Sequence, residues 1–319
     1  MHINCQNDIY QNETSAYADY ILPATDMLER SDFPVSHMVL QTVPYAQFTR
    51  AVVEPQHERR PEWQIFSDLA VACGVKLFGA TLCNLLPRLN RGLHRLPVIG
   101  RKVGPHTIKP EHLLALLLRW GRRTTLRELK QTPEGILLGA TEPHSFLGKR
   151  VPTQDGMVQL WPEKLVASLP RLESSSEAYR QSTGKLQLIG RRNRRSHNSW
   201  MHNNPKIKQP QGNIALMNPA DAEERNIEQN SLVMIQSEIG TTSLPVKLTD
   251  DVAKGVVVVP HGWGHSGSGL TRASKLPGIN INEVIPGGAE NMEPNSGQAI
   301  VLGHFVQVER ITEMSSVPA

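Results

Sequence analysis

One long stretch of the chain lacks acidic residues: no Asp or Glu stands between Glu177 and Asp221. The whole protein has a net charge of only +4, from 34 basic and 30 acidic residues, so positive charge is concentrated locally. The basic residues of this stretch are Arg180, Lys185, Arg191, Arg192, Arg194, Arg195, Lys206 and Lys208. Such a stretch favours an anionic ligand such as phosphate, or a solvated basic face.

Cysteines, aromatics and long apolar runs are also scarce. The three cysteines are few and widely spaced, which argues against a disulfide framework and against a cysteine-based zinc or iron–sulfur site. Aromatic residues make up 5% of the chain, which argues against a stacking platform for nucleic acid. The most apolar run, residues 113–118, is too short to span a bilayer. The first ten residues lack the pattern of a secretory signal, so the expected location is cytoplasmic.

The N-terminal half predicts a few short elements. Residues 1–10 are typical of the last strand of an open α/β sheet, followed by a short helix over 13–20 and a short strand over 20–22. Helices are predicted over 61–73 and 111–120 from their apolar spacing. Residues 77–107 form a basic segment with many prolines and glycines. Residues 174–176, three serines between Glu173 and Glu177, indicate a linker.

The C-terminal part is rich in short β-prone runs. These runs cover residues 185–189, 213–217, 231–236, 243–248, 256–259 and 299–308. One helix interrupts them, with Asn218 as its N-cap and Pro219 at its first position. Many short strands with small helices predict a closed or nearly closed barrel.

Two segments carry a family resemblance. The first runs from Asn7-Asp8 through Glu13-Thr14 and residues 18–25 to Glu29-Arg30, and the second covers residues 190–203. In this order and spacing, the chain resembles the C-terminal part of a molybdopterin-dependent oxidoreductase of the dimethyl-sulfoxide-reductase superfamily. It is similar in particular to formate-dehydrogenase-like and biotin-sulfoxide-reductase-like members.

The resemblance implies an α+β fold in three parts. Residues 1–74 would be the tail of the α/β molybdopterin oxidoreductase domain, and residues 75–182 a helical or irregular connecting segment. Residues 183–319 would be a double-psi-type β-barrel that binds the molybdopterin dinucleotide. The implied cofactor is molybdopterin guanine dinucleotide with molybdenum or tungsten, and an iron–sulfur cluster, if present, would lie on an N-terminal part.

The same resemblance implies which residues contact the cofactor. Arginine suits the pyrophosphate, while amide, hydroxyl and imidazole groups suit the pterin edges. The expected cofactor-binding residues are Arg191, His197, Asn198, Ser199, His202, Asn203, Asn282, Ser296 and Gly297. Asp8, Thr14 and Asp19 are consistent either with contacts to the nucleotide end or with capping of strand ends. No catalytic residue and no metal ligand are expected in this chain.

The glycine-rich segment 262–268 admits other interpretations. Its G-x-G-x-x-G pattern suits a dinucleotide fold, but Pro277 and Gly278 interrupt the helix that such a fold needs. A nucleophile elbow needs glycine where Ser268 stands. His261 and His265 would form a metal pair on a helix, but the nearby glycines argue against one. The remaining interpretation is a barrel loop whose backbone approaches a ligand or a neighbouring strand.

The expected function is cofactor binding within an enzyme of two-electron redox or oxo-transfer chemistry on a small molecule. The expected partner is the N-terminal half of the same enzyme or a separate subunit, without which the chain would be an inactive fragment. No nucleic acid and no membrane span are expected. The alternative is a non-catalytic, barrel-bearing binding or assembly protein, and a serine hydrolase is a more distant one.

Overall fold

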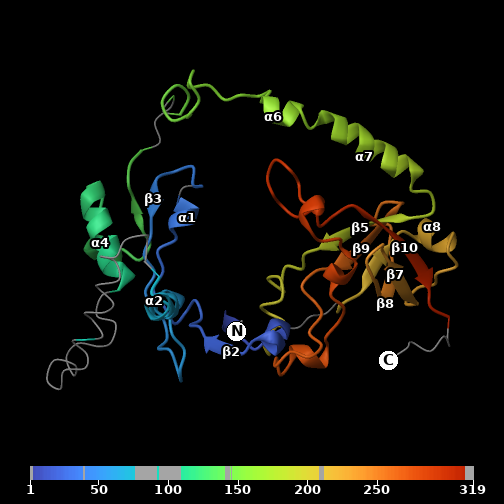
Figure 1. Cartoon of the computed structure of the whole chain (residues 1–319), viewed down its shortest axis with the longest axis horizontal. Coiled ribbons are helices and arrows are strands. Elements are labelled where there is room, and N and C mark those ends of the chain that lie inside the picture. Colours follow the sequence, from blue (N-terminus) through green and yellow to red (C-terminus); the bar gives the residue numbers. More distant parts are fainter. Residues whose placement is uncertain are drawn as a thin grey trace. The chain divides into compact units, whose positions relative to one another are not determined.

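The chain folds into two compact units (Figure 1). The computed structural model describes residues 3–38, 40–75, 92, 109–140, 144, 146–207 and 212–312. The first unit comprises Met1–Tyr10 and Tyr17–Val158, and the second comprises Gln11–Ala16 and Gln159–Ala319. Of the helices in the described ranges, none has the length and apolarity needed to cross a bilayer. The basic segment predicted over 77–107 lies outside the described residues, apart from residue 92.

Short elements and a small core make up the first unit. Its strands β1 (Cys5–Asp8) and β2 (Tyr20–Pro23) pair in parallel, as expected for the end of an α/β sheet. The predicted helices over 61–73 and 111–120 are present as α2 (Glu62–Ala72) and α4 (Pro110–Gly121). The other elements are α1 (Val35–Met38), β3 (Tyr45–Ala46), α5 (Leu126–Gln131) and β4 (Ile136–Leu137). Ala46, Phe48 and Leu129 form the buried centre.

The second unit is a closed six-stranded barrel. Its strands are β5 (Leu186–Arg191), β6 (Ala215–Met217), β7 (Leu232–Gln236), β8 (Thr241–Leu248), β9 (Val256–Pro260) and β10 (His304–Arg310). Buried and outward residues alternate along these strands, most regularly in β8, because successive side chains point to opposite faces. The inward residues form the main core of the unit, which includes Leu188, Met217, Val246, Val257 and Val306.

The strand order identifies the type of barrel. The closed order is β10-β5-β9-β6-β8-β7. Strand β9 lies between β5 and β6, which follow one another in the sequence, and β6 lies between β8 and β9. These two interlocked insertions are the double-psi arrangement. The predicted α+β class with a double-psi-type barrel is therefore confirmed.

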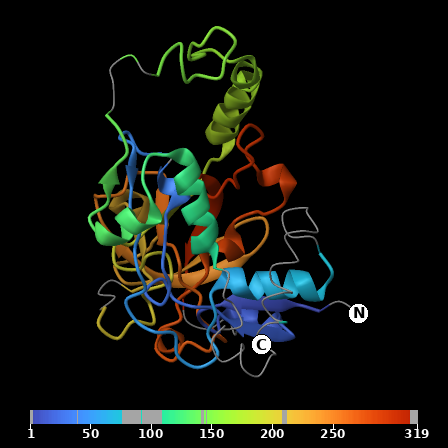
Figure 2. The same ribbon diagram turned by 90° about the vertical axis from the view of Figure 1, so that its left-hand side faces the viewer.

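Helices α8 (Pro219–Glu223) and α7 (Leu169–Gln181) of the second unit test two predictions from the sequence, a capping residue and a linker. Asn218 caps α8, since its side-chain oxygen accepts from the Ala220 amide at 3.0 Å, as predicted. The predicted linker at residues 174–176 is wrong: these serines lie inside α7, which follows α6 (Glu163–Val166) and precedes β5. Every residue of α7 is exposed, and the helix is drawn in yellow-green (Figure 1 and Figure 2). Ser174 and Ser175 bond the carbonyls one turn earlier, so they do not interrupt it.

Candidate functional site

Two loops leave the barrel side by side. Strands β5 and β9 are parallel neighbours, with Arg191 opposite Pro260. Their carboxyl ends therefore lie at the same end of the barrel, and the His261 amide donates to the Arg191 carbonyl at 2.9 Å. We call residues 191–207 the basic loop and residues 261–269 the glycine loop. The basic loop and the glycine loop therefore begin side by side.

Gly262 brings the two loops into backbone contact. A Cβ atom at this position would lie 2.5 Å from the Asn198 carbonyl oxygen, and the φ angle of +88° is one that favours glycine. The sequence predicted that this backbone approaches a ligand or a neighbouring strand, and the structure shows it against a neighbouring loop, the basic loop.

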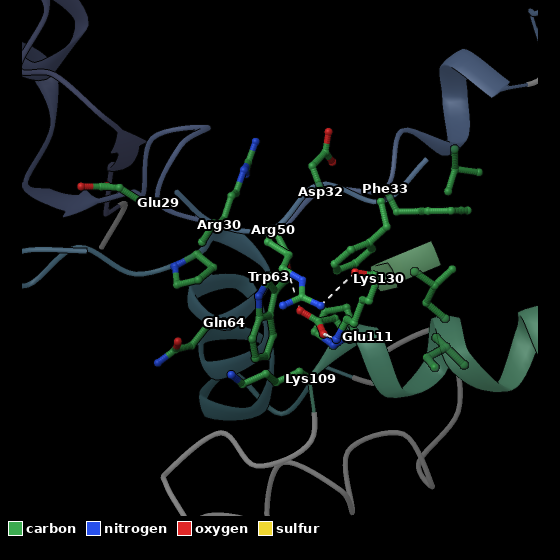
Figure 3. A pocket seen from close by; sticks show the side chains of 18 of the residues that line it. Glu29, Arg30, Asp32, Phe33, Arg50, Trp63, Gln64, Lys109, Glu111 and Lys130 are labelled. Carbon is green, nitrogen blue, oxygen red and sulfur yellow. Dashed lines mark hydrogen bonds and ion pairs between the residues drawn. The ribbon is translucent and has the colours of Figure 1, made fainter. Parts of the chain in front are cut away.

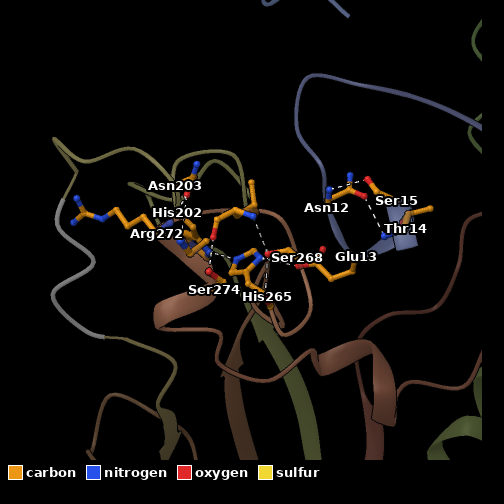
Figure 4. A network of polar contacts seen from close by, with 12 residues as sticks. Asn12, Glu13, Thr14, Ser15, His202, Asn203, His265, Ser268, Arg272 and Ser274 are labelled. Atoms are coloured by element: carbon orange, nitrogen blue, oxygen red, sulfur yellow. Dashed lines mark hydrogen bonds and ion pairs between the residues drawn. The ribbon is translucent and has the colours of Figure 1, made fainter. Parts of the chain in front are cut away.

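A buried pair of histidines joins the loops further on (Figure 4). His202 Nδ1 lies 2.7 Å from His265 Nε2, with the two rings perpendicular. Their residues are only 4% and 3% exposed. The second nitrogen of His265, Nδ1, lies 3.3 Å from a carboxylate oxygen of Glu13. A chain of three titratable groups thus runs from the interior of the loops to the 3-10 helix η1 (Glu13–Tyr17).

Glu13 reaches His265 because the segment around it packs on the glycine loop. The Gly269 amide donates to the Gln11 carbonyl at 3.0 Å, and a Cβ atom at Gly269 would lie 2.9 Å from Gln11 Cβ. Ser15 Oγ accepts from the Asn12 amide at 2.9 Å, which closes the turn that precedes η1. This contact explains why Gln11–Ala16 belongs to the barrel unit.

Trp263 and Asn213 complete the site with polar atoms that lack a protein partner. The ring of Trp263 packs against that of His202, with centroids 4.3 Å apart and ring planes tilted by 40°. A Cβ atom at Gly278 would touch both Trp263 and Asn213. Among the described residues, His202 Nε2, Trp263 Nε1 and Asn213 Nδ2 are buried without a hydrogen-bond partner. Each such atom costs about 1–3 kcal/mol, so a ligand that supplies partners here is favoured.

Burial also fixes the charge state of His202. Burial lowers the pKa of His202 from 6.5 to about 4, and the neighbouring His265 makes a smaller contribution in the same direction. The imidazole is therefore neutral near pH 7, with one nitrogen protonated and the other a hydrogen-bond acceptor.

The predicted residues of the basic loop differ in their exposure and contacts. Arg191, His197 and Asn198 are exposed, and Ser199 is half-buried. His197 and Asn198 have φ angles of 44° and 60°, the left-handed conformation of a sharp turn. Asn203 instead holds the loop together, because its side-chain oxygen accepts from the backbone amides of Arg272 and Ala273 at 2.9 and 3.2 Å.

The later predicted residues lie in other loops. Asn282 is exposed in η4 (Ile281–Val284), whose N-cap residue, Asn280, touches Gly264 of the glycine loop. Ser296 and Gly297 lie in an exposed turn that Glu293 closes. Hydrogen bonds from Ser296 and Asn295 lower the pKa of the Glu293 carboxyl to about 2. The contacts of Ser296 and Gly297 place them in this turn rather than in the histidine cluster.

Some residues of the site were not predicted. Glu13 and His265 were part of noted motifs, but the sequence offered His261 as the partner of His265, and the fold supplies His202 and Glu13 instead. Trp263 and Asn213 gave no signal of their own. Asp8 and Asp19 accept backbone hydrogen bonds from Ile9 and Asn4, as capping residues do.

The first unit contains a separate cavity of about 940 Å³ (Figure 3). Its charged side chains largely satisfy one another: Arg30 pairs with Glu62, and Lys130 lies 2.5 Å from Glu111. Burial acts to raise the pKa of Glu111, but hydrogen bonds from Lys130 and Ser31 outweigh it and lower the pKa. Arg50 donates to the Lys130 carbonyl at 2.9 Å. These paired charges make a weaker case for a ligand than the unpartnered atoms of the barrel.

Comparison with known proteins assigns both units. The family model for the molydopterin dinucleotide binding domain matches residues 186–299, and the molybdopterin oxidoreductase model matches residues 5–72. The chain belongs to the dimethyl-sulfoxide-reductase family of molybdopterin oxidoreductases. Its barrel is thus the family's dinucleotide-binding domain, whose cofactor is molybdopterin guanine dinucleotide with molybdenum. All nine predicted residues lie within the matched barrel segment.

Individual relatives agree with this membership. Dimethyl sulfoxide reductase DmsA of Haemophilus influenzae is 26% identical over 80% of this chain and 32% of its own length. Thiosulfate reductase subunit PhsA of Salmonella typhimurium is 25% identical over 88% of this chain and 36% of its own length. Acetylene hydratase from Pelobacter acetylenicus has a similar fold, with a TM-score of 0.63, 18% identity, and coverage of 98% of this chain and 41% of its own. The chain spans about a third of the length of the curated relatives it matches.

Proposed function

We propose that this chain is the cofactor-binding C-terminal part of a molybdenum oxidoreductase that performs two-electron redox or oxo-transfer chemistry on a small molecule. The observation that carries the proposal is the pair of loops at the β5 and β9 ends, with its buried, unpartnered polar atoms. A pterin ring system has several polar edges, so it fits a site that presents imidazole, indole and amide groups without partners. When bound, the cofactor supplies the redox chemistry at its metal, while the protein orients it.

Each loop would have its own task in this proposal. Arg191 and the neighbouring exposed arginines would meet the phosphates, because guanidinium groups bind phosphate in a bidentate way. His197, Asn198, Ser199 and His202 would contact the pterin. Asn203 would act indirectly, by holding the basic loop against Arg272 and Ala273. Asn282, Ser296 and Gly297 would border the dinucleotide.

The partner in this proposal is an N-terminal part of the same enzyme, in the same chain or as a separate subunit. The relatives that this chain matches are themselves about three times longer than the matched segment. That part would carry the remaining cofactor contacts and, where present, the iron–sulfur cluster. The cytoplasmic location and the identity of the small-molecule substrate stay predictions.

The test is the cofactor content of loop variants. The chain is produced together with its N-terminal part in a host that makes molybdopterin guanine dinucleotide, and the bound pterin and guanine nucleotide are measured per chain. We expect Ser199→Ala with His202→Gln to lower the affinity tenfold or more, since contacts to charged groups contribute about 1.5–3 kcal/mol each.

The matched control is Lys247→Ala, which removes an exposed charge from β8 on the barrel wall. It should leave the cofactor content at the wild-type level. Equal cofactor content in the double variant and the control would contradict the proposed site. A wild-type complex without any pterin would favour the alternative, a non-catalytic binding protein.

A further inference from the structure

The histidine pair links a buried imidazole to a carboxylate at the surface. His202 and His265 are buried, whereas the Glu13 side chain is 41% exposed. Figure 4 shows His265 between His202 on one side and Glu13 on the other. The three groups come from the basic loop, the glycine loop and η1, so three separate segments converge to make this row.

The chemistry of the three groups fixes which atom donates and which accepts in each hydrogen bond of the row. A carboxylate oxygen only accepts, so Nδ1 of His265 carries a proton and donates to Glu13. Nε2 of a neutral His265 is then an acceptor, and His202 Nδ1 must donate to it across 2.7 Å. It follows that Nε2 of His202 is unprotonated, and this is the buried atom that lacks a protein partner.

We propose that Glu13 and His265 are positioning residues that hold His202 in the tautomer with a free lone pair on Nε2. This inference rests on the proposed function, which places the polar edge of the pterin dinucleotide against the loops. His202 Nε2 would accept a hydrogen bond from an N–H or O–H group of that ligand.

Other charged groups near the row are engaged elsewhere. Arg272 follows the glycine loop, and its guanidinium donates to the carbonyls of Pro205 and Ile207 at 2.7 and 3.5 Å. Ser268 donates to the His265 carbonyl rather than to its ring. In the described part of the chain, the titratable groups that form this row are Glu13, His265 and His202.

The test is the tautomer of His202 in the full chain, measured by proton–nitrogen correlation spectra of histidine labelled with ¹⁵N. The His202→Gln variant assigns the ring. In the wild type near pH 7 we expect His202 Nε2 to have the ¹⁵N chemical shift of an unprotonated ring nitrogen. Glu13→Gln removes the obligatory acceptor, so the Nε2 shift should move toward the value of a mixture of tautomers.

Two variants control for the substitution itself. Glu13→Asp keeps a carboxylate and should restore the wild-type preference in part, and Glu309→Gln, at an exposed position of β10, should leave it unchanged. A protonated Nε2 in the wild type, or identical His202 shifts in the wild type and Glu13→Gln, would overturn this inference. Because the tautomer is read without cofactor, a failure of cofactor binding alone would reject the proposed function and not this inference.

Discussion

Neighbouring residues of the basic loop have different roles although their chemistry is similar. The sequence grouped His202 and Asn203 as cofactor contacts, yet His202 points to His265 and Asn203 caps the backbone near Arg272. Residue types and loop position predicted a polar site in this loop, and the structure places a cluster of buried polar groups there. They did not predict which side chains serve the loop and which face a ligand, because that depends on contacts between segments far apart in the sequence.

Gly262 offers a direct test of the contact between the loops. We expect Gly262→Ala to destabilise the chain by about 1–2 kcal/mol for the left-handed backbone, and by about 1–3 kcal/mol more for the overlap with Asn198. Gly267→Ala is the matched control, since its φ is +78° but nothing lies within 4 Å of the added atom. Denaturant unfolding of both variants measures the difference. Equal losses would show that the loops do not meet at this point.

The lowered pKa of His202 predicts a pH dependence. Since the folded pKa is about 4 and the ordinary value is 6.5, the unfolded chain binds more protons within this window. The free energy of unfolding is therefore fully retained above pH 6.5 and falls as the pH drops toward 4. The loss is of the order of 3 kcal/mol, at about 1.4 kcal/mol per pKa unit.

His202→Gln should flatten this dependence in unfolding curves recorded from pH 7 to pH 4.5. His197→Asn, an exposed position in the same loop, should keep the wild-type slope. A slope that survives in His202→Gln would assign the pH dependence to other groups.

Elements with strong local signals were predicted well. The helices α2 and α4, the Asn218 cap and most barrel strands lie within a few residues of their predicted ranges. Errors occurred where local signals mislead. The serines of α7 are typical of linkers, and β10 begins at His304 rather than at 299 because Ala299 instead bridges to Met292. The strand order was not predictable from alternation alone, since β6 and β9 interlock through long-range pairing.

Helix α8 contains a buried carboxylate that ties it to the barrel. Asp221 is 2% exposed and accepts from the Gly255 amide at 2.7 Å, directly before β9. Asp221→Ala should destabilise the chain by about 1–3 kcal/mol, because it leaves this amide without a partner. Asp221→Asn keeps an acceptor and should cost less, and Glu223→Ala on the exposed face of α8 should have little effect. Thermal melts rank the three variants, and equal melting temperatures would contradict the role of Asp221.

At the scale of the whole molecule, the proposed cofactor site lies in the barrel unit and includes Glu13, from a segment far from the barrel strands in the sequence. Glu13 lies within the segment matched by the molybdopterin oxidoreductase model, and His265 lies within the matched barrel segment. The resemblance predicted both segments. It did not predict that they meet at a histidine, because neither segment alone contains the row from Glu13 to His202.

Exposed apolar side chains on helix α4 of the first unit lead us to expect that the chain self-associates. Helix α4 exposes Leu116 and Trp120, which are 63% and 81% accessible, and an apolar patch of this kind favours contact with other chains. We expect light scattering of the purified 319-residue chain to show oligomers or aggregates at micromolar concentration. Leu116→Gln with Trp120→Gln should shift the distribution toward the monomer. A monodisperse wild-type monomer would contradict this prediction.

The central claim is that the basic loop and the glycine loop together bind the molybdopterin dinucleotide. The most direct measurement is an experimental structure of the chain with its N-terminal part and bound cofactor. The account predicts cofactor density in contact with both loops, with polar cofactor atoms within hydrogen-bond distance of His202 Nε2 and Trp263 Nε1. Cofactor density that touches neither loop, with these two atoms still unpartnered or bridged only by water, would contradict it.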